Sequence, residues 1–172
     1  GMGQIGARVP GSLGKAAFPL AVQSMSVKTR IDGDLATTIV DQVFFNPASD
    51  DLEGVYRVRV PRGAVLDSFC IDRPGRLGKP LMCGYVKEKQ TARRQYRAQV
   101  YVGSRDDPAL LEWEAPGQYK AHIYPIKAGS IRRVVVMYTE WLESTGGVRH
   151  WRYPMASPGS AASPAQRANA VR

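Results

Sequence analysis

The chain has 172 residues, of which 44% are hydrophobic and 23% are charged, and its formal net charge is +9 at pH 7. These values are ordinary for a globular protein and predict one domain with a real core plus tails. No apolar run is long enough to span a bilayer, which excludes a transmembrane helix within these residues. The positive charge permits a polyanion partner, but it is scattered along the chain and equally serves solubility.

The first stretch, residues 1–17, is rich in glycine and small residues, and we expect it to be a flexible N-terminal arm. Residues 1–6 match G-x-G-x-x-G by letter. The dinucleotide motif requires a strand before it and a helix after it, so we reject this match. The N-terminus also lacks the charged, apolar and small-residue layout of a signal peptide.

Alternation then predicts strands. Met25, Val27 and Ile31 alternate with polar residues, and an Asp-Gly-Asp turn leads into residues 35–61, around which the domain is organised. This stretch reads as a hairpin, because a turn rich in Asn, Pro, Ser and Asp at 46–51 separates two alternating arms. In the first arm Thr38, Val40, Gln42 and Phe44 share one face, and in the second arm Tyr56, Val58 and Val60 oppose Arg57 and Arg59.

Two further strands are predicted at residues 65–71 and 81–86, with a turn between them. Cys70 and Cys83 lie at equal distances from that turn, so a symmetric register would place them opposite each other. A cross-strand disulfide on the outward face is therefore possible, and two free thiols are an equally good interpretation. No other cysteine or histidine lies near either one, which argues against a metal site.

The period changes at residues 87–100, where good helix formers dominate and Ala92, Tyr96 and Val100 recur at four-residue spacing. We expect the only substantial helix here, at about residues 87–99. Its other face carries Arg93, Arg94 and Arg97, which are read either as a solvated face or as part of a ligand surface.

Further short strands are predicted at residues 109–114, 119–123, 131–142 and 148–154, and residues 157–172 read as a Ser/Ala/Pro-rich linker. The whole pattern predicts a mainly β protein, an antiparallel β-sandwich of about eight or nine strands with one helix. The expected organisation is an arm at 1–17, a domain at 18–156 and a linker at 157–172.

Four blocks in order resemble the VIT domain, the vault protein and inter-α-trypsin inhibitor heavy-chain module. They are Val40-x-Gln42-x-Phe44-x-Asn46-Pro47; Leu52-Glu53-x-Val55-Tyr56 with Val60-Pro61 and Gly63-Ala64-x-Leu66-x-Ser68-Phe69; Val86-Lys87-Glu88-Lys89 with Ala92-Arg93 and Tyr96; and Ala109-Leu110-Leu111-Glu112 with Pro125-Ile126 and Val134-x-Val136-x-Tyr138. The resemblance covers about residues 19–154. Arg59, where the family often has proline, and the cysteine pair depart from it.

The resemblance implies a non-catalytic interaction or structural module. It also implies a secreted, surface or envelope protein, with a von Willebrand A domain following in the full-length chain. Gln42 and Asn46, within the family blocks, are expected to satisfy backbone groups rather than to bind a ligand.

Two alternatives belong to other functional classes. A polyanion-binding domain, for sulfated polysaccharide or nucleic acid, would use Arg57, Arg59, Arg93, Arg94 and Arg97, but few aromatic residues lie among them for base stacking. An enzyme is disfavoured, because His122 and His150 have no sequence neighbours that suggest a catalytic or metal site. No cofactor and no metal are expected.

Overall fold

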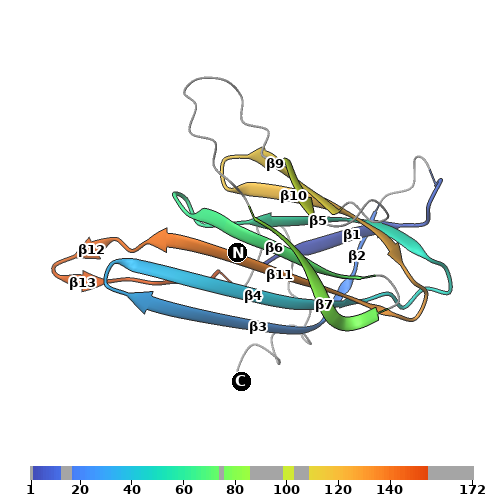
Figure 1. The fold of residues 1–172 in the computed structure, drawn as a ribbon, viewed down its shortest axis with the longest axis horizontal. Helices are drawn as coiled ribbons and strands as arrows, with labels where there is room; N and C mark the ends of the chain where they lie inside the picture. The colour runs from blue at the N-terminus through green and yellow to red at the C-terminus, as the bar shows by residue number, and fades with distance from the viewer. Residues whose placement is uncertain (1, 13–16, 74–75, 86–98, 103–108, 155–172) are drawn as a thin grey trace.

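The computed structural model describes residues 2–12, 17–73, 76–85, 99–102 and 109–154, and these residues form two antiparallel sheets packed together (Figure 1). In chain order the strands are β1 (Gln4–Arg8), β2 (Phe18–Pro19), β3 (Ala21–Asp32), β4 (Leu35–Phe45), β5 (Leu52–Arg59), β6 (Val65–Arg73), β7 (Arg76–Tyr85), β8 (Gln99–Val102), β9 (Ala109–Ala115), β10 (Gln118–Ile126), β11 (Ile131–Trp141), β12 (Ser144–Thr145) and β13 (Val148–Arg149).

The first sheet has six strands in the order β2-β1-β5-β10-β9-β8, and the second has five in the order β3-β4-β11-β6-β7. Strands β12 and β13 form a small separate pair that projects at one end (Figure 1). The prediction of a mainly β, antiparallel two-sheet protein is confirmed. The strand count is not, and residues 87–98 of the predicted helix lie outside the described residues, while Gln99 begins β8.

The faces predicted for residues 35–61 are confirmed, but the predicted hairpin is wrong. Thr38, Val40 and Phe44 are buried on β4, and Tyr56 and Val58 are buried on β5. The two strands nevertheless belong to different sheets, since β4 lies between β3 and β11 while β5 lies between β1 and β10. Residues 46–51 thus carry the chain from one sheet to the other, and the apolar faces of β4 and β5 meet across the core.

Aromatic rings form the centre of that core. The ring centroids of Phe44 and Tyr56 lie 6.1 Å apart in an edge-to-face arrangement, and those of Tyr56 and Phe69 lie 5.8 Å apart. All three side chains are fully buried. Because edge-to-face pairs add to the burial of ring area, these contacts hold the two sheets together.

The expected N-terminal arm is wrong for residues 4–8, which form strand β1. β1 pairs with β5 along its whole length, and the side chains of Ile5 and Ala7 are buried in the core. The strand is short and contains a glycine, so its composition resembles a linker although its alternation fits a sheet. Residues 13–16 and 155–172 lie outside the described residues, and the linker expected at 157–172 stays a prediction.

Gln42 joins the two sheets through hydrogen bonds. Its side-chain Nε2 donates to the carbonyl of Gly3 at 3.0 Å, and its Oε1 accepts from the Gly3 N–H and from the Tyr56 hydroxyl, each at 3.2 Å. A Cβ atom at residue 3 would lie only 2.0 Å from the Tyr56 hydroxyl oxygen, so the close approach requires glycine there. As predicted, Gln42 satisfies backbone groups.

We predict that Phe44→Ala lowers the free energy of unfolding by about 3–5 kcal/mol, because it leaves a cavity between the two sheets. The matched control is Phe18→Ala, since Phe18 is 40% exposed and its loss leaves no enclosed cavity. Urea denaturation of both variants provides the measurement. Equal midpoints for the two variants would show that Phe44 is not in the core.

A second prediction tests the position of β1. Ile5→Ala should cost about 2–5 kcal/mol of stability, because Ile5 is buried against the core. The control variant is Val9→Ala, because Val9 directly follows β1 and is exposed. This substitution should change the free energy of unfolding by less than about 0.5 kcal/mol. If Ile5→Ala is as neutral as Val9→Ala in chemical denaturation, β1 is not part of the folded core.

Candidate functional site

The outward face of the six-stranded sheet carries the two arginines of the predicted polyanion surface that the structure describes. Arg57 and Arg59 are both exposed on β5. The Arg57 Nε lies 3.4 Å from a carboxylate oxygen of Glu114 on β9, and Lys120 Nζ lies 3.6 Å from Glu112. Arg57 is thus part of a mixed-sign group of side chains, while Arg59 has no ion-pair partner among the described residues.

Arg93, Arg94 and Arg97 lie outside the described residues, so the structure does not bring the five arginines of that surface together. His122 and His150, the only two histidines of the chain, are both exposed. Glu112 contacts Lys120.

Apolar side chains gather on the outward face of the five-stranded sheet instead. We call this surface the Trp141 face and define it by Leu35, Ile39, Val65, Met137 and Trp141. Strand register places Leu35 opposite Trp141 and Ile39 opposite Met137, while Val65 lies opposite Thr139 on the other side of β11. Trp141 is 70% exposed and Leu35 is 37% exposed, so both side chains are accessible.

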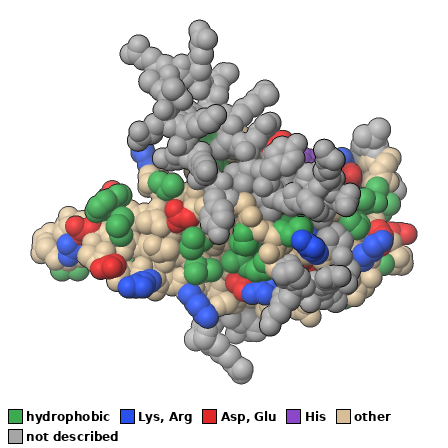
Figure 2. All heavy atoms as spheres, viewed as in Figure 1, with side chains coloured by type: hydrophobic (Ala, Val, Ile, Leu, Met, Phe, Trp, Pro, Cys, Tyr) green, Lys and Arg blue, Asp and Glu red, His purple; other side chains and the backbone are tan. Residues whose placement is uncertain are grey.

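A hydrogen-bonded polar row crosses the same face. The hydroxyl oxygens of Thr37 and Thr139 lie 3.1 Å apart, and the Thr139 hydroxyl donates to the Asp67 carboxylate at 2.7 Å. These bonds link β4, β11 and β6 on the same face as the apolar side chains. Figure 2 shows apolar and charged side chains interspersed at the end of the molecule where β12 and β13 project.

Basic side chains border the Trp141 face along β3. Lys28 lies opposite Ile39, and Arg30 lies opposite Thr37. Among the described residues no carboxylate lies within ion-pair distance of Lys28 or Arg30. The border is therefore basic, and its charge is available to a partner.

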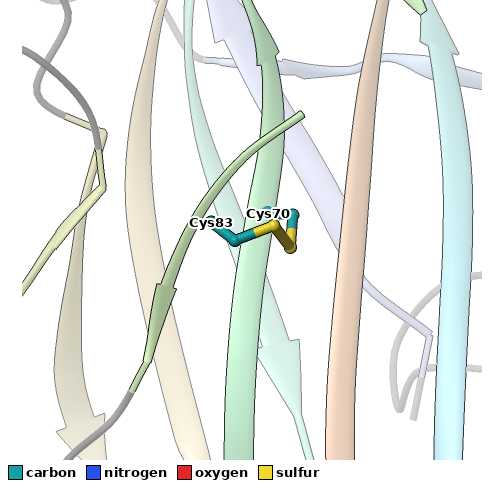
Figure 3. The surroundings of a disulfide bond; sticks show 2 residues. All are labelled: Cys70 and Cys83. Atoms are coloured by element: carbon teal, nitrogen blue, oxygen red, sulfur yellow. A yellow bond between two sulfur atoms is a disulfide. The ribbon is translucent and has the colours of Figure 1, made fainter. Parts of the chain in front are cut away.

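The two cysteines lie farther along the same outward face. Cys70 on β6 lies opposite Cys83 on β7, with their Cα atoms 4.0 Å apart, and the structure joins the sulfur atoms at 2.05 Å (Figure 3). Cys70 is nearly buried, whereas Cys83 is exposed. The register is the symmetric one that the sequence allowed, with Ile71 opposite Met82 next to the pair.

Asn46 acts on the backbone, as the sequence predicted. Its Nδ2 donates to the carbonyl oxygens of Ile126 and Lys127 at 2.9 and 3.1 Å, and its Oδ1 accepts from the Ala48 N–H at 2.9 Å. The side chain is completely buried. It therefore ties the crossing between β4 and β5 to the end of β10, and it is not free to bind a ligand.

A buried ion pair also has a structural role. Arg132 Nε donates to Asp72 Oδ1 at 2.9 Å, and Arg132 Nη1 donates to the carbonyl of Pro125 at 2.6 Å. Burial raises the pKa of Asp72, and the positive charge of Arg132 acts against that rise. The pair links β6, β10 and β11 inside the sandwich, away from the Trp141 face.

Tyrosines close the end of the core near the C-terminal segment. Burial raises the pKa of Tyr138 to about 12, and the nearby Thr38 hydroxyl acts in the opposite direction. Tyr153 packs against the core, and its ring stacks on that of Trp151 with centroids 6.4 Å apart. Burial raises the pKa of Tyr153 as well, and both rings fill the end of the core.

Neither a metal site nor a membrane-spanning helix is found in the part of the chain that the structure describes. No group of three or more His, Cys, Asp or Glu side chains there could hold a metal ion. These residues contain no helix that is long and apolar enough to cross a membrane. The strongest candidate for a functional surface is thus the Trp141 face, which the sequence analysis did not single out. The sequence signal that could have revealed this face lies in β11. Met137 and Trp141 alternate there with the buried residues, so they lie on the outward side of the strand.

Comparison with protein-family models matches residues 22–138 to the Vault protein inter-alpha-trypsin domain. The matched region begins in β3 and ends in β11, so it contains most of both sheets. No curated protein matches the chain.

We predict that Cys70 and Cys83 remain unmodified when the protein is exported to an oxidising compartment, purified without reductant and alkylated under denaturing conditions. The directly opposed register brings the two thiols together. A double Cys70→Ser/Cys83→Ser variant should lose at most about 3 kcal/mol, since the closed loop is short. Mass spectrometry that finds both thiols alkylated would contradict the bond.

Proposed function

Because the chain belongs to the vault protein inter-alpha-trypsin (VIT) domain family, we propose that it is a non-catalytic module that binds a partner protein through the Trp141 face. The observation that carries the proposal is the exposure of Trp141 beside Leu35 on the outward face of the five-stranded sheet. Tryptophan is enriched among the residues that dominate binding energy at protein interfaces, and such residues lie within apolar patches bordered by polar groups.

The chemistry of the border favours one kind of partner. Lys28 and Arg30 flank the apolar side chains, and the whole chain carries a formal net charge of +9. A partner with an apolar centre and an acidic rim would bury Trp141 and neutralise the border at once. A second copy of the chain would bring two basic borders together, so we propose a different protein as the occupant.

Family membership supports the non-catalytic part of the proposal, since VIT domains are non-enzymatic modules. The buried polar side chains of Gln42, Asn46 and Asp72 are all held by structural contacts. Within the described residues both histidines are exposed, and neither is hydrogen-bonded through its side chain to an acidic group.

A polyanion as the partner receives less support. The proposed surface was Arg57, Arg59, Arg93, Arg94 and Arg97. Only the first two are described, and Glu112 and Glu114 lie on the same outward face as Arg57. Carboxylates between the cations would repel phosphate or sulfate groups. The polyanion reading stays a prediction from the sequence.

We also propose an extracytoplasmic location and a von Willebrand A domain downstream in the full-length protein. VIT domains occur in extracellular proteins, and this supports the location. The Cys70–Cys83 bond supports it independently, because disulfides persist in oxidising compartments and are rare in the cytosol.

The test uses a photoreactive phenylalanine analogue in place of Trp141 in the source cells. The matched control places the same analogue at Tyr124, an aromatic residue that is 54% exposed on the six-stranded sheet. We expect a crosslinked protein from position 141 that is absent from position 124. That protein, once purified, should bind the wild-type chain and lose at least about tenfold in affinity with Trp141→Ala.

The Tyr124→Ala variant should bind the purified partner with unchanged affinity. Equal crosslinking from positions 141 and 124 would overturn the assignment of the Trp141 face. So would a purified partner that binds Trp141→Ala as tightly as the wild type.

A further inference from the structure

Strand β3 is the outermost strand of the five-stranded sheet (Figure 1). It runs from Ala21 to Asp32 and pairs with β4 on one side only. Among the residues that the structure describes, no strand pairs with its other side. A long edge strand presents unpaired N–H and C=O groups, which can accept a further strand.

The turn between β3 and β4 determines which backbone groups are open. Asp32 lies opposite Leu35, so only Gly33 and Asp34 form the loop, and Gly33 has a φ of 59°. In such a two-residue hairpin the closing pair is hydrogen-bonded, and bonded and non-bonded pairs then alternate along the strands. The amides of Ser26, Lys28 and Arg30 therefore point to β4.

The amides of Met25, Val27, Thr29 and Ile31 point to the open edge by the same alternation. The Thr29 and Thr38 hydroxyl oxygens lie 2.9 Å apart, which fits a non-hydrogen-bonded pair, where side chains are closest. The open groups thus form a regular row, and the only irregularity in the pairing with β4 lies at the other end, between Val22 and Ser24.

The side chains of β3 add a chemical pattern to this row. On the outward face Ser26, Lys28 and Arg30 follow one another at alternate positions, and the two basic groups have no ion-pair partner among the described residues. On the inward face Val27 packs partly against the core, and Ile31 is 53% exposed. An added strand would need carboxylates on one face and apolar side chains on the other.

A second copy of β3 does not meet these requirements. Antiparallel pairing centred on Thr29 would place Lys28 of one copy opposite Arg30 of the other, and like charges directly opposite each other are destabilising. Basic residues on an edge strand therefore protect against self-pairing. They leave the edge open to a strand of opposite charge.

We propose that the edge of β3 binds an extended acidic segment of a partner protein as an additional strand. Carboxylates at alternate positions of that segment lie beside Lys28 and Arg30, and its apolar residues lie beside Val27 and Ile31. The inference rests on the proposed function in that the ligand is a protein. It concerns the sheet edge and not the Trp141 face, so each can fail alone.

The probe is a synthetic peptide of the same length as β3, capped at both ends, in which Glu alternates with Val and Thr. Amide hydrogen exchange measured by NMR on the whole chain provides the readout. Without peptide, Ser26, Lys28 and Arg30 should exchange slowly, and Val27 and Thr29 should exchange fast. With peptide, Val27 and Thr29 should become protected by at least about tenfold, because strand addition bonds their amides.

Two controls separate strand addition from simple charge attraction. The Lys28→Glu/Arg30→Glu variant should lose at least about tenfold in peptide affinity, whereas Arg59→Glu/Arg62→Glu, with the same change in net charge at exposed positions away from β3, should lose less than about threefold. A peptide of the same sequence with N-methyl groups on the amides that face β3 should not bind measurably.

The proposal is overturned if the N-methylated peptide binds as well as the parent, because charge alone then explains the affinity. It is also overturned if Val27 and Thr29 gain no protection, or if both charge-reversal variants weaken binding equally. Trp141→Ala should leave peptide affinity unchanged. If Trp141→Ala binds the peptide normally and the crosslinking experiment at position 141 fails, the proposal for the β3 edge stands and the proposal for the Trp141 face is rejected.

Discussion

The side-chain amide of Gln42 is the contact on which the arrangement of the two sheets depends. It lies on β4 of the five-stranded sheet, yet its hydrogen bonds go to Gly3 and Tyr56 at the six-stranded sheet. Loss of the amide would leave the Gly3 backbone groups and the Tyr56 hydroxyl buried without partners, at a cost of about 1–3 kcal/mol each. The amide therefore anchors the N-terminal segment where it enters the sandwich, directly before β1 pairs with β5.

Alternation along the sequence was enough to predict the inward faces of β4 and β5, because side-chain direction in a strand depends only on residue parity. It could not predict that the two strands lie in different sheets. That depends on the crossing at residues 46–51, where Asn46 bonds the backbone of β10, a strand far away in the sequence. β1 was not predicted for a related reason. Its five residues contain too little apolar area to be recognised as a strand without the pairing to β5.

The candidate site was hidden in the same way. The residues of the Trp141 face come from β4, β6 and β11, and only the register that sets Trp141 opposite Leu35 and Val65 opposite Thr139 brings them onto one surface. Conversely, the sequence alone indicated no ion-pair partner for Arg57. Its partner Glu114 is on β9, and the two meet only because β10 lies between β5 and β9 in the six-stranded sheet. Charge signs can be read from a sequence, but charge pairing requires the sheet order.

An exposed apolar face next to a long open edge is ordinarily a route to aggregation, because both features can pair with another copy. In this protein two basic side chains, Lys28 and Arg30, lie where the two features meet. Lys28 faces outward from the edge strand and lies opposite Ile39 of the Trp141 face. Any contact between two copies through this corner brings like charges together, whereas an acidic partner gains attraction at the same point. If the two proposed contacts exist, Lys28 and Arg30 would therefore disfavour pairing between copies at this corner and favour a partner of opposite charge.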